Sequence, residues 1–196
     1  MERPMDDKER TTTELLQTLD SDYRECYSQL LKRLDEGERT EDGTISAGNG
    51  FAERQLIRAA FAYIEGATYV LKIEALFNAE EKGIDLTPQQ SHFIFEADFD
   101  LNDEGEVTQR PAKISLARNI RFAISIYEQA NGLAPHFDPN AEWWSLLRKS
   151  IRVRDRLMHP RWPTDLDVAP AETIAMAKAK AGFDEVLETL LATRKV

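Results

Sequence analysis

The sequence predicts an all-helical protein. Apolar residues recur at steps of three and four through most of the 196 residues, which is the spacing of one face of an α-helix. Residues that begin or end helices, such as Pro88, Gly83 and Gly132, stand at the borders of these patterns. We expect five long helices and one short helix. The long ones cover residues 11–34, 51–82, 113–131, 141–159 and 170–194, and the short one covers residues 88–96.

The first two long helices have clear apolar stripes. In residues 11–34 the stripe consists of Leu16, Leu19, Tyr23, Cys26, Leu30 and Leu34. Residues 51–82 carry a wider stripe without proline, which predicts a central helix with several neighbours, and Gly66 would let another helix approach closely. Residues 35–50 hold four glycines, much charge and no periodicity, so we expect a flexible loop there and a flexible start over residues 1–10.

A small insertion is expected over residues 84–111. Thr87, Pro88 and Gln90 match the capping box of a helix N-terminus, which starts the short helix. From Glu96 onward, the run EADFDLNDEG alternates apolar and acidic residues and ends on a glycine that favours a turn. This alternation predicts a small hairpin.

The acids of that run allow a second interpretation as a calcium site. Asp98, Asp100 and Asn102 have the spacing of the first three ligands in a calcium-binding loop. The sixth position is Asp103 in place of glycine, however, and the twelfth is Gln109 in place of glutamate. We therefore expect an acidic surface loop that needs no metal.

Composition bounds the class of protein. The apolar share of 42% and the charged share of 31% are those of a soluble globular protein, and the length suits one domain over residues 1–196. The start, MERPMDDKER, is not a signal peptide, and no run of about 18 apolar residues exists, so we expect a cytoplasmic protein without membrane contact. Cys26 is the only cysteine, which excludes an internal disulfide. The net charge of −10 argues against a protein that coats nucleic acid broadly.

The end of the fourth long helix departs from this acidic character. Residues 148–161 hold six cations and one acid, a local balance of +5. The six cations are Arg148, Lys149, Arg152, Arg154, Arg156 and Arg161. A basic helix end on an acidic protein is a candidate binding site for a phosphate.

Helical geometry places two candidate groups in this stretch. Arg154 falls in the middle of an apolar arc, where a buried guanidinium would need a partner. The arc consists of Trp143, Leu147, Ile151, Leu157 and Met158. On the opposite, polar side, Asp155 precedes His159 by one turn and could hold its imidazole in one tautomer. Pro160 biases His159 out of the helical conformation, which leaves the direction of the imidazole open.

The run Arg154-Asp155-Arg156-Leu157-Met158-His159 resembles the R-x4-6-H motif of HEPN domains. The longer pattern W-x-x-L-x-x-x-I-x-x-R-D-R-L-x-H-P, from Trp144, is similar to bacterial members of that family. The resemblance is specific over about residues 113–168. Arg152 also satisfies the motif, with six residues before His159, but the polar residue after Arg154 favours Arg154.

The resemblance implies a fold and an activity. The fold would be an up-and-down bundle of about five long helices, with the short helix and the hairpin inserted at residues 84–111. Many HEPN domains are metal-independent ribonucleases, including toxins of toxin–antitoxin pairs, phage-defence proteins and nuclease domains of RNA-targeting CRISPR effectors. The implied partners are RNA, a second copy of the chain facing it through residues 141–160, and an antitoxin protein. No cofactor is implied.

Such a ribonuclease needs residue types that this stretch contains. His159 would act as general base or acid, because histidine exchanges a proton near neutral pH. Arg154 would hold two oxygens of the phosphate, and Asp155 would orient His159. Arg148, Arg152, Arg156 and Arg161 would bind the RNA backbone. One histidine per chain supplies one acid–base group, so the second would come from water or from the facing protomer.

A non-catalytic module is the competing interpretation. In that case the same Arg and His side chains would bind RNA, a nucleotide or a partner protein without cleavage. Trp143 and Trp144 could stack on bases, but we expect them in the core or an interface, as is usual for tryptophan. His92 and His136 lack partners at metal-ligand spacing.

Overall fold

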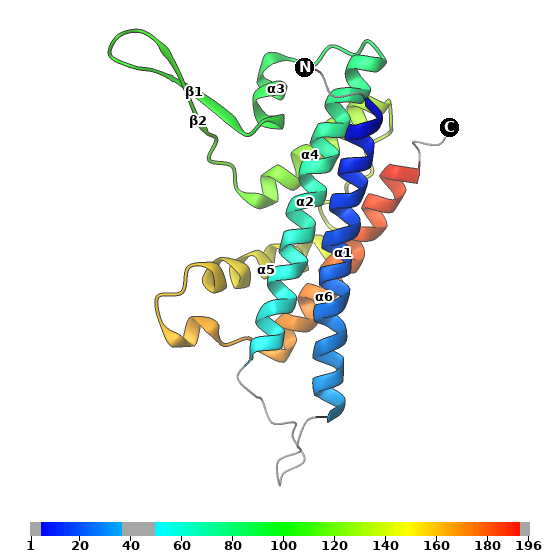
Figure 1. Ribbon diagram of the computed structural model, residues 1–196, viewed down its shortest axis with the longest axis vertical. Helices are drawn as coiled ribbons and strands as arrows, with labels where there is room; N and C mark the ends of the chain where they lie inside the picture. The colour runs from blue at the N-terminus through cyan, green and yellow to red at the C-terminus, as the bar shows by residue number, and fades with distance from the viewer. Residues whose placement is uncertain (1–4, 37–49, 193–196) are drawn as a thin grey trace. The chain divides into compact units, whose positions relative to one another are not determined.

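The computed structural model describes residues 5–36 and 50–192. Within this part the protein is mostly helical, with six α-helices, one short 3₁₀ helix and a two-stranded antiparallel hairpin (Figure 1). The helices are α1 (Met5–Glu36), α2 (Phe51–Glu81), α3 (Pro88–Ile94), α4 (Leu116–Asn131), α5 (Glu142–Met158), η1 (Pro163–Leu166) and α6 (Pro170–Ala192). The strands are β1 (Ala97–Leu101) and β2 (Val107–Pro111). The predicted helices and the hairpin are therefore confirmed.

Most predicted boundaries agree with the structure to within a few residues. The exception is α1, which begins at Met5, within the stretch expected to be flexible. Residues 1–4, residues 37–49 of the predicted loop and the end of the last predicted helix at 193–194 lie outside the described residues. Helix α5 is capped by Ala141, whereas Asp138 or Asn140 was the expected start. Asp138 instead accepts the backbone N–H of Asn140 at 2.8 Å and forms a turn before the helix.

Local chemistry explains the borders of the shorter helices. At the start of α3, the Thr87 side chain accepts the N–H of Gln90 at 3.2 Å, and the Gln90 side chain accepts the N–H of Thr87 at 2.9 Å. This is the predicted capping box. Helix α4 ends at Gly132, whose φ of 65° lies in the left-handed region that glycine adopts without strain.

The chain packs as two compact units. Within the described residues, the first unit consists of 5–36, 50–66 and 138–185, and the second of 67–137 and 186–192. Helices α2 and α6 contribute one part of their length to each unit. A single HEPN-like domain over residues 1–196 stays a prediction.

The core of the first unit is built around Phe183 of α6, which is 1% exposed. Its ring meets Tyr63 of α2 edge-on at 6.5 Å and lies 6.3 Å from Trp143 of α5. Trp144 is 5% exposed, and its ring lies 5.6 Å from that of Trp143. Both tryptophans are therefore packed inside the unit, as expected.

The buried face of α6 does not follow the polarity of its residues. Ile174 is apolar, but it is 58% exposed. The buried residues of α6 in this unit are Thr173, Met176, Ala179, Lys180 and Phe183. The buried Lys180 interrupts the apolar pattern of this face, so the pattern of apolar residues alone does not reveal the face in the sequence.

Lys180 is 5% exposed and is stabilised from several sides. Its ammonium donates to Asp20 and to Asp184, each at 2.8 Å. It also lies 4.1 Å from the ring centre of Tyr63 and 4.6 Å from that of Tyr23. The carboxylates and the electron-rich ring faces offset the loss of water around the cation. Burial, together with the nearby acids, raises the pKa of Tyr23 to about 12.

A second buried lysine organises the other unit. Lys72 of α2 has no exposed surface and donates to Glu96 at 2.5 Å and to Asn119 of α4 at 3.2 Å. Glu96 adopts a φ of 51°, which is rare for a residue other than glycine, and its carbonyl accepts the N–H of Ala112 at 2.8 Å. Burial raises the pKa of Glu96, but the hydrogen bonds from Lys72 and Asn119 outweigh it and hold that pKa below its usual range. Glu96 thereby fixes the start of the hairpin.

The hairpin has one charged face and one apolar face. Arg110 of β2 binds Asp98 at 3.0 Å and Asp100 at 3.3 Å, so these two acids of the calcium-like pattern contact a cation of the chain itself. The opposite face carries Leu101 and Val107, which are paired in register and are 67% and 70% exposed.

No helix in the described part of the chain is long and apolar enough to cross a bilayer.

Close helix packing at two glycines gives a prediction about stability. A Cβ added at Gly182 of α6 would collide with the Cβ and ring of Trp143, and a Cβ cannot rotate away. A Cβ added at Gly66 would meet only the Cδ1 of Leu19, the end of a flexible side chain. We expect Gly182→Ala to lower the free energy of unfolding by about 1–3 kcal/mol. Gly66→Ala should cost less, because Leu19 can turn and alanine favours the helix by about 1 kcal/mol.

Urea denaturation followed by circular dichroism measures both variants. A Gly182→Ala protein as stable as the wild type, or a Gly66→Ala protein that is the less stable of the two, would contradict this packing.

Candidate functional site

The helix that carries the HEPN-like motif ends at Met158, within one residue of the predicted end. His159 follows with φ −130° and ψ 56°, and its backbone N–H donates to the carbonyl of Asp155 at 3.1 Å. Pro160 therefore turns His159 out of the helix, as expected. The chain then reverses through η1, which packs against α5 (Figure 1).

Asp165 holds the turn that follows His159. Its carboxylate accepts the backbone N–H groups of Arg161 at 2.7 Å and Trp162 at 2.9 Å, and its own N–H donates to the carbonyl of Trp162 at 3.0 Å. These hydrogen bonds to the charged form hold the pKa of the Asp165 carboxyl below its usual range. The turn is thus fixed by hydrogen bonds although it lies on the surface.

Helix α2 binds the end of α5 through one face. Arg58 donates to the carbonyl of Leu157 at 3.3 Å, and Arg54 donates to the carbonyl of Leu166 in η1 at 3.2 Å. Glu65 binds Arg154 at 2.6 Å. Steps of four and seven residues place these three α2 side chains on the same side of the helix. The two arginines satisfy carbonyls that a helix end leaves without partners.

Arg154 was expected to need a partner, and that partner is Glu65. A second contact runs from its Nη1 to the carboxylate of Asp155 at 3.0 Å. Its side chain is 26% exposed, so it lies at the border of the buried face and not in the middle of an apolar arc. The buried face of α5 consists of Trp144, Leu147, Ser150, Val153 and Leu157. The predicted arc was wrong because it counted Met158, which is 49% exposed, as interior.

Asp155 does not orient His159 in this structure. Its carboxylate binds Arg154, while the exposed His159 imidazole has no hydrogen bond or ion pair to any residue that the structure describes. The reason is Pro160, since a histidine outside the helical conformation no longer faces the residue one turn before it. The prediction assumed that both residues lie in the helix, but the helix ends at Met158.

The remaining cations of the cluster fall into two groups. Arg156 is engaged internally, because its Nη2 donates to Glu172 and to the carbonyl of Asp167, both at 2.6 Å. This internal role does not fit the expected contact with RNA. The other four are exposed, and their side chains bind no acid in the described part of the chain: Arg148, Lys149, Arg152 and Arg161.

Together these groups form what we call the α5 basic end: Arg148, Lys149, Arg152, His159 and Arg161. Four exposed cations that form no ion pair attract an anion, and an exposed imidazole can act as a proton donor or acceptor. The arrangement is therefore suited to bind a phosphodiester and to move a proton close to it. Among the described residues, no group of three or more His, Cys, Asp or Glu side chains is placed to hold a metal ion.

Several residues of this region were not singled out from the sequence. Glu65 and Arg58 lie about 90 to 100 positions before their partners, and no local pattern links them. Asp165 could have been found, because an acid three residues after Trp162, with Pro163 between them, has the spacing of a helix cap. Trp162 stands out only through its 70% exposure.

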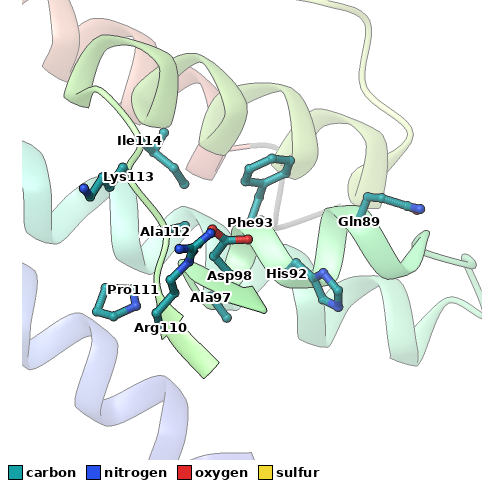
Figure 2. Close-up of a pocket in the computed structure, with 10 residues that line it drawn as sticks. All are labelled: Gln89, His92, Phe93, Ala97, Asp98, Arg110, Pro111, Ala112, Lys113 and Ile114. Atoms are coloured by element: carbon teal, nitrogen blue, oxygen red, sulfur yellow. Dashed lines mark hydrogen bonds and ion pairs between the residues drawn. The ribbon is translucent and has the colours of Figure 1, made fainter. Parts of the chain in front are cut away.

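Two hollows elsewhere on the protein are less suited to chemistry than the α5 basic end. In the second unit, a hollow of about 500 Å3 lies between α3 and the hairpin (Figure 2). Figure 2 shows Asp98 and Arg110 side by side at this hollow, where they bind each other. His92, which also lines the hollow, has its ring centre 4.6 Å from that of Phe99. The acid of this hollow, Asp98, and its arginine, Arg110, are therefore already paired with each other.

In the first unit, an apolar groove of about 380 Å3 runs between α1 and α6. Tyr27, Leu31 and Ile174 line it and are 40%, 45% and 58% exposed. Its one acid, Glu53, binds Arg33 at 2.8 Å. The groove offers apolar contact but no free carboxylate for acid–base chemistry.

Comparison with models of protein families, with curated proteins and with solved structures finds no significant match to this chain. The case for a site at the α5 basic end therefore rests on its own geometry and on the motif formed by Arg154 and His159.

The different surroundings of the two candidate arginines give a prediction about stability. Arg154→Ala removes a partly buried, charged hydrogen bond to Glu65 and should lower the free energy of unfolding by about 1–2 kcal/mol. Arg152→Ala removes a side chain without a partner in the described structure and should change stability by less than about 0.5 kcal/mol. Urea denaturation of both variants measures the difference.

Glu65→Gln is the matched control. The cost of Arg154→Ala should be smaller in the Glu65→Gln background, because the two side chains form one interaction. Strictly additive costs would mean that the pair contributes no stability.

Proposed function

We propose that this protein is a metal-independent endoribonuclease of the HEPN type, acting as a toxin or a defence factor. One observation carries the proposal: the exposed His159 lies at the end of a helix, in a stretch with four exposed cations that form no ion pair with an acid in the described structure. The whole chain has a net charge of −10, so this concentration of positive charge is local. The motif R-x4-6-H, formed by Arg154 and His159, supports the assignment to HEPN.

The chemistry follows from the groups present. His159 removes the proton of an RNA 2′-hydroxyl, and the 2′-oxygen attacks the adjacent phosphorus. The bond from phosphorus to the 5′-oxygen breaks, and an acid donates a proton to that oxygen. The products are a 2′,3′-cyclic phosphate and a 5′-hydroxyl. Negative charge gathers on the phosphate oxygens as attack proceeds, and cations of the α5 basic end lower the energy of that state.

Two arginines compete for the role of phosphate clamp. Arg154 matches the motif best, and Glu65 and Asp155 hold its guanidinium in place. These same carboxylates occupy part of its donors, so a phosphate must bind the remaining N–H groups or displace a carboxylate. Arg152, at the six-residue spacing, is exposed and has its whole fork available. We assign the clamp to Arg154 and the contact with the RNA backbone to Arg148, Arg152 and Arg161.

A specific observation favours the non-catalytic alternative. His159 lacks the orienting bond from Asp155, and the motif arginine is already paired with Glu65. A site with these properties would bind RNA phosphates, a nucleotide or an acidic partner protein without cleaving a bond. The two functions differ in whether removal of His159 abolishes a reaction or leaves binding unchanged.

The proposed enzyme needs a second proton-transfer group, which leads to a prediction about assembly. Each chain offers one histidine at the α5 basic end, so we propose a homodimer in which the 141–160 segments of two protomers face each other across a two-fold axis. Arg154 binds Glu65 within its own unit and needs no charged partner from the second protomer. Light scattering at micromolar concentration should give twice the chain mass of 22.4 kDa. A monomer, or a dimer unaffected by substitutions in α5, would contradict it.

The central prediction concerns His159. The purified protein should cleave single-stranded RNA in the presence of EDTA, and His159→Ala should lower the rate on the order of a hundredfold or more while the fold is kept. Arg154→Lys should also lower the rate, because an ammonium cannot make the paired bonds of a guanidinium. Arg152→Ala should mainly weaken binding and its dependence on salt. Gel analysis of the products, with a test for cyclic phosphate ends, provides the measurement.

The controls separate the competing interpretations. Circular dichroism of each variant shows whether the fold is retained. Loss of turnover in Arg152→Ala, with a folded and active Arg154→Ala protein, would transfer the clamp to Arg152. Intact RNA after incubation with the wild type, together with equal RNA binding by wild type and His159→Ala, would favour the non-catalytic module.

A further inference from the structure

Trp162 differs from the other two tryptophans. Trp143 and Trp144 pack inside the first unit, whereas Trp162 is 70% exposed. Within the described residues its indole makes no ring contact, cation contact or hydrogen bond. Tryptophan offers the largest apolar surface of any side chain, so leaving it in water forgoes a substantial hydrophobic gain. An exposed indole beside a cationic cluster is therefore available to contact a partner outside the chain.

The indole is displayed from a fixed backbone. The carboxylate of Asp165 accepts the N–H groups of both Arg161 and Trp162, and Pro163 has a fixed φ and restricts the backbone of Trp162 before it. A surface loop that was free to move would lose conformational entropy on binding a ligand. Here the backbone is ordered beforehand, which leaves mainly the side-chain torsions of Trp162 to be fixed.

Trp162 also lies next to the groups proposed to act on the phosphate. It follows Arg161 directly and stands three positions after His159, which places the two Cα atoms within about 11 Å of each other. A phosphodiester at His159 carries a base on each side. A separation of this size allows one of these bases to reach the indole while Arg161 contacts the backbone between them.

We propose that Trp162 stacks on an unpaired base beside the phosphate held at His159, and that this contact makes the site select single-stranded over double-stranded RNA. This inference rests on the proposed function. In a duplex, each base is covered on both faces by its neighbours, so an indole on a rigid turn has no face to contact. In a single strand, a base can turn outward and stack on an aromatic side chain, and every base offers such a face. The stacking selects strand state and not base identity.

The test uses oligonucleotides that cannot be cleaved. A single-stranded RNA with all 2′-hydroxyls methylated, and the duplex of the same sequence, are titrated against the full-length protein by fluorescence anisotropy. Trp162→Ala should weaken binding of the single strand on the order of 10- to 100-fold and leave duplex binding unchanged. Trp162→Phe should recover most of the loss, because a phenyl ring can also stack.

Arg161→Ala is the matched control from the neighbouring position. It removes a cation and should weaken the single strand and the duplex to a similar degree. Tryptophan emission gives a second readout that a merely structural role would not move. The single strand should quench the emission of the wild type and should not quench that of Trp162→Phe, whose remaining tryptophans are Trp143 and Trp144.

The outcomes distinguish this inference from the nuclease proposal. Equal affinity of wild type and Trp162→Ala for the single strand, or equal losses for single strand and duplex, would overturn the stacking role. A wild type that binds neither oligonucleotide would overturn it as well. Cleavage of unmodified RNA is measured in parallel. Selective binding through Trp162 without cleavage would uphold the stacking site and contradict the nuclease proposal. Cleavage that depends on His159 but not on Trp162 would uphold the nuclease proposal and contradict the stacking site.

Discussion

The contact between Glu65 of α2 and Arg154 of α5, 2.6 Å long, is the interaction on which the candidate site depends. It joins two helices far apart in sequence and places a guanidinium at the border of the core, where its charge needs compensation. Arg58 acts at the same helix end by donating to the carbonyl of Leu157. With the end of α5 fixed in this way, the residues after it are presented from a rigid base, and Arg148, Lys149, Arg152 and Arg161 remain available to an anion.

The two buried lysines follow the same physical rule in their separate units. Lys180 is surrounded by Asp20, Asp184 and two tyrosine rings, and Lys72 by Glu96 and Asn119. A cation without such partners would lose its proton or destabilise the fold. Both buried lysines are thus paired, whereas Arg148, Lys149, Arg152 and Arg161 are exposed and form no ion pair with an acid in the described part of the chain.

Local patterns were sufficient to predict most of the helices. The capping box at Thr87, the stop at Gly132 and the bias of Pro160 on His159 each depend on neighbours in sequence, and all three are present. Faces of helices were predicted less well, because Lys180 lies inside and Ile174 outside, contrary to their polarity. The partners of Arg154 and Leu157 could not be predicted, since a residue on another helix supplies each contact. The exposure of Trp162 likewise depends on which neighbours fail to cover it.

The charged face of the hairpin has a consequence for the behaviour of the protein at high concentration. A two-stranded sheet has two outer edges, and no strand in the described part of the chain pairs with either of them. Such edges invite the strands of another molecule to add on and extend the sheet. Two β1 strands brought together would place Asp98 and Asp100 of each molecule near those of the other, and Pro111 in β2 lacks the N–H that a ladder requires. The aspartates that resemble calcium ligands, although Arg110 binds both of them, thus disfavour the joining of separate molecules into a continuous sheet.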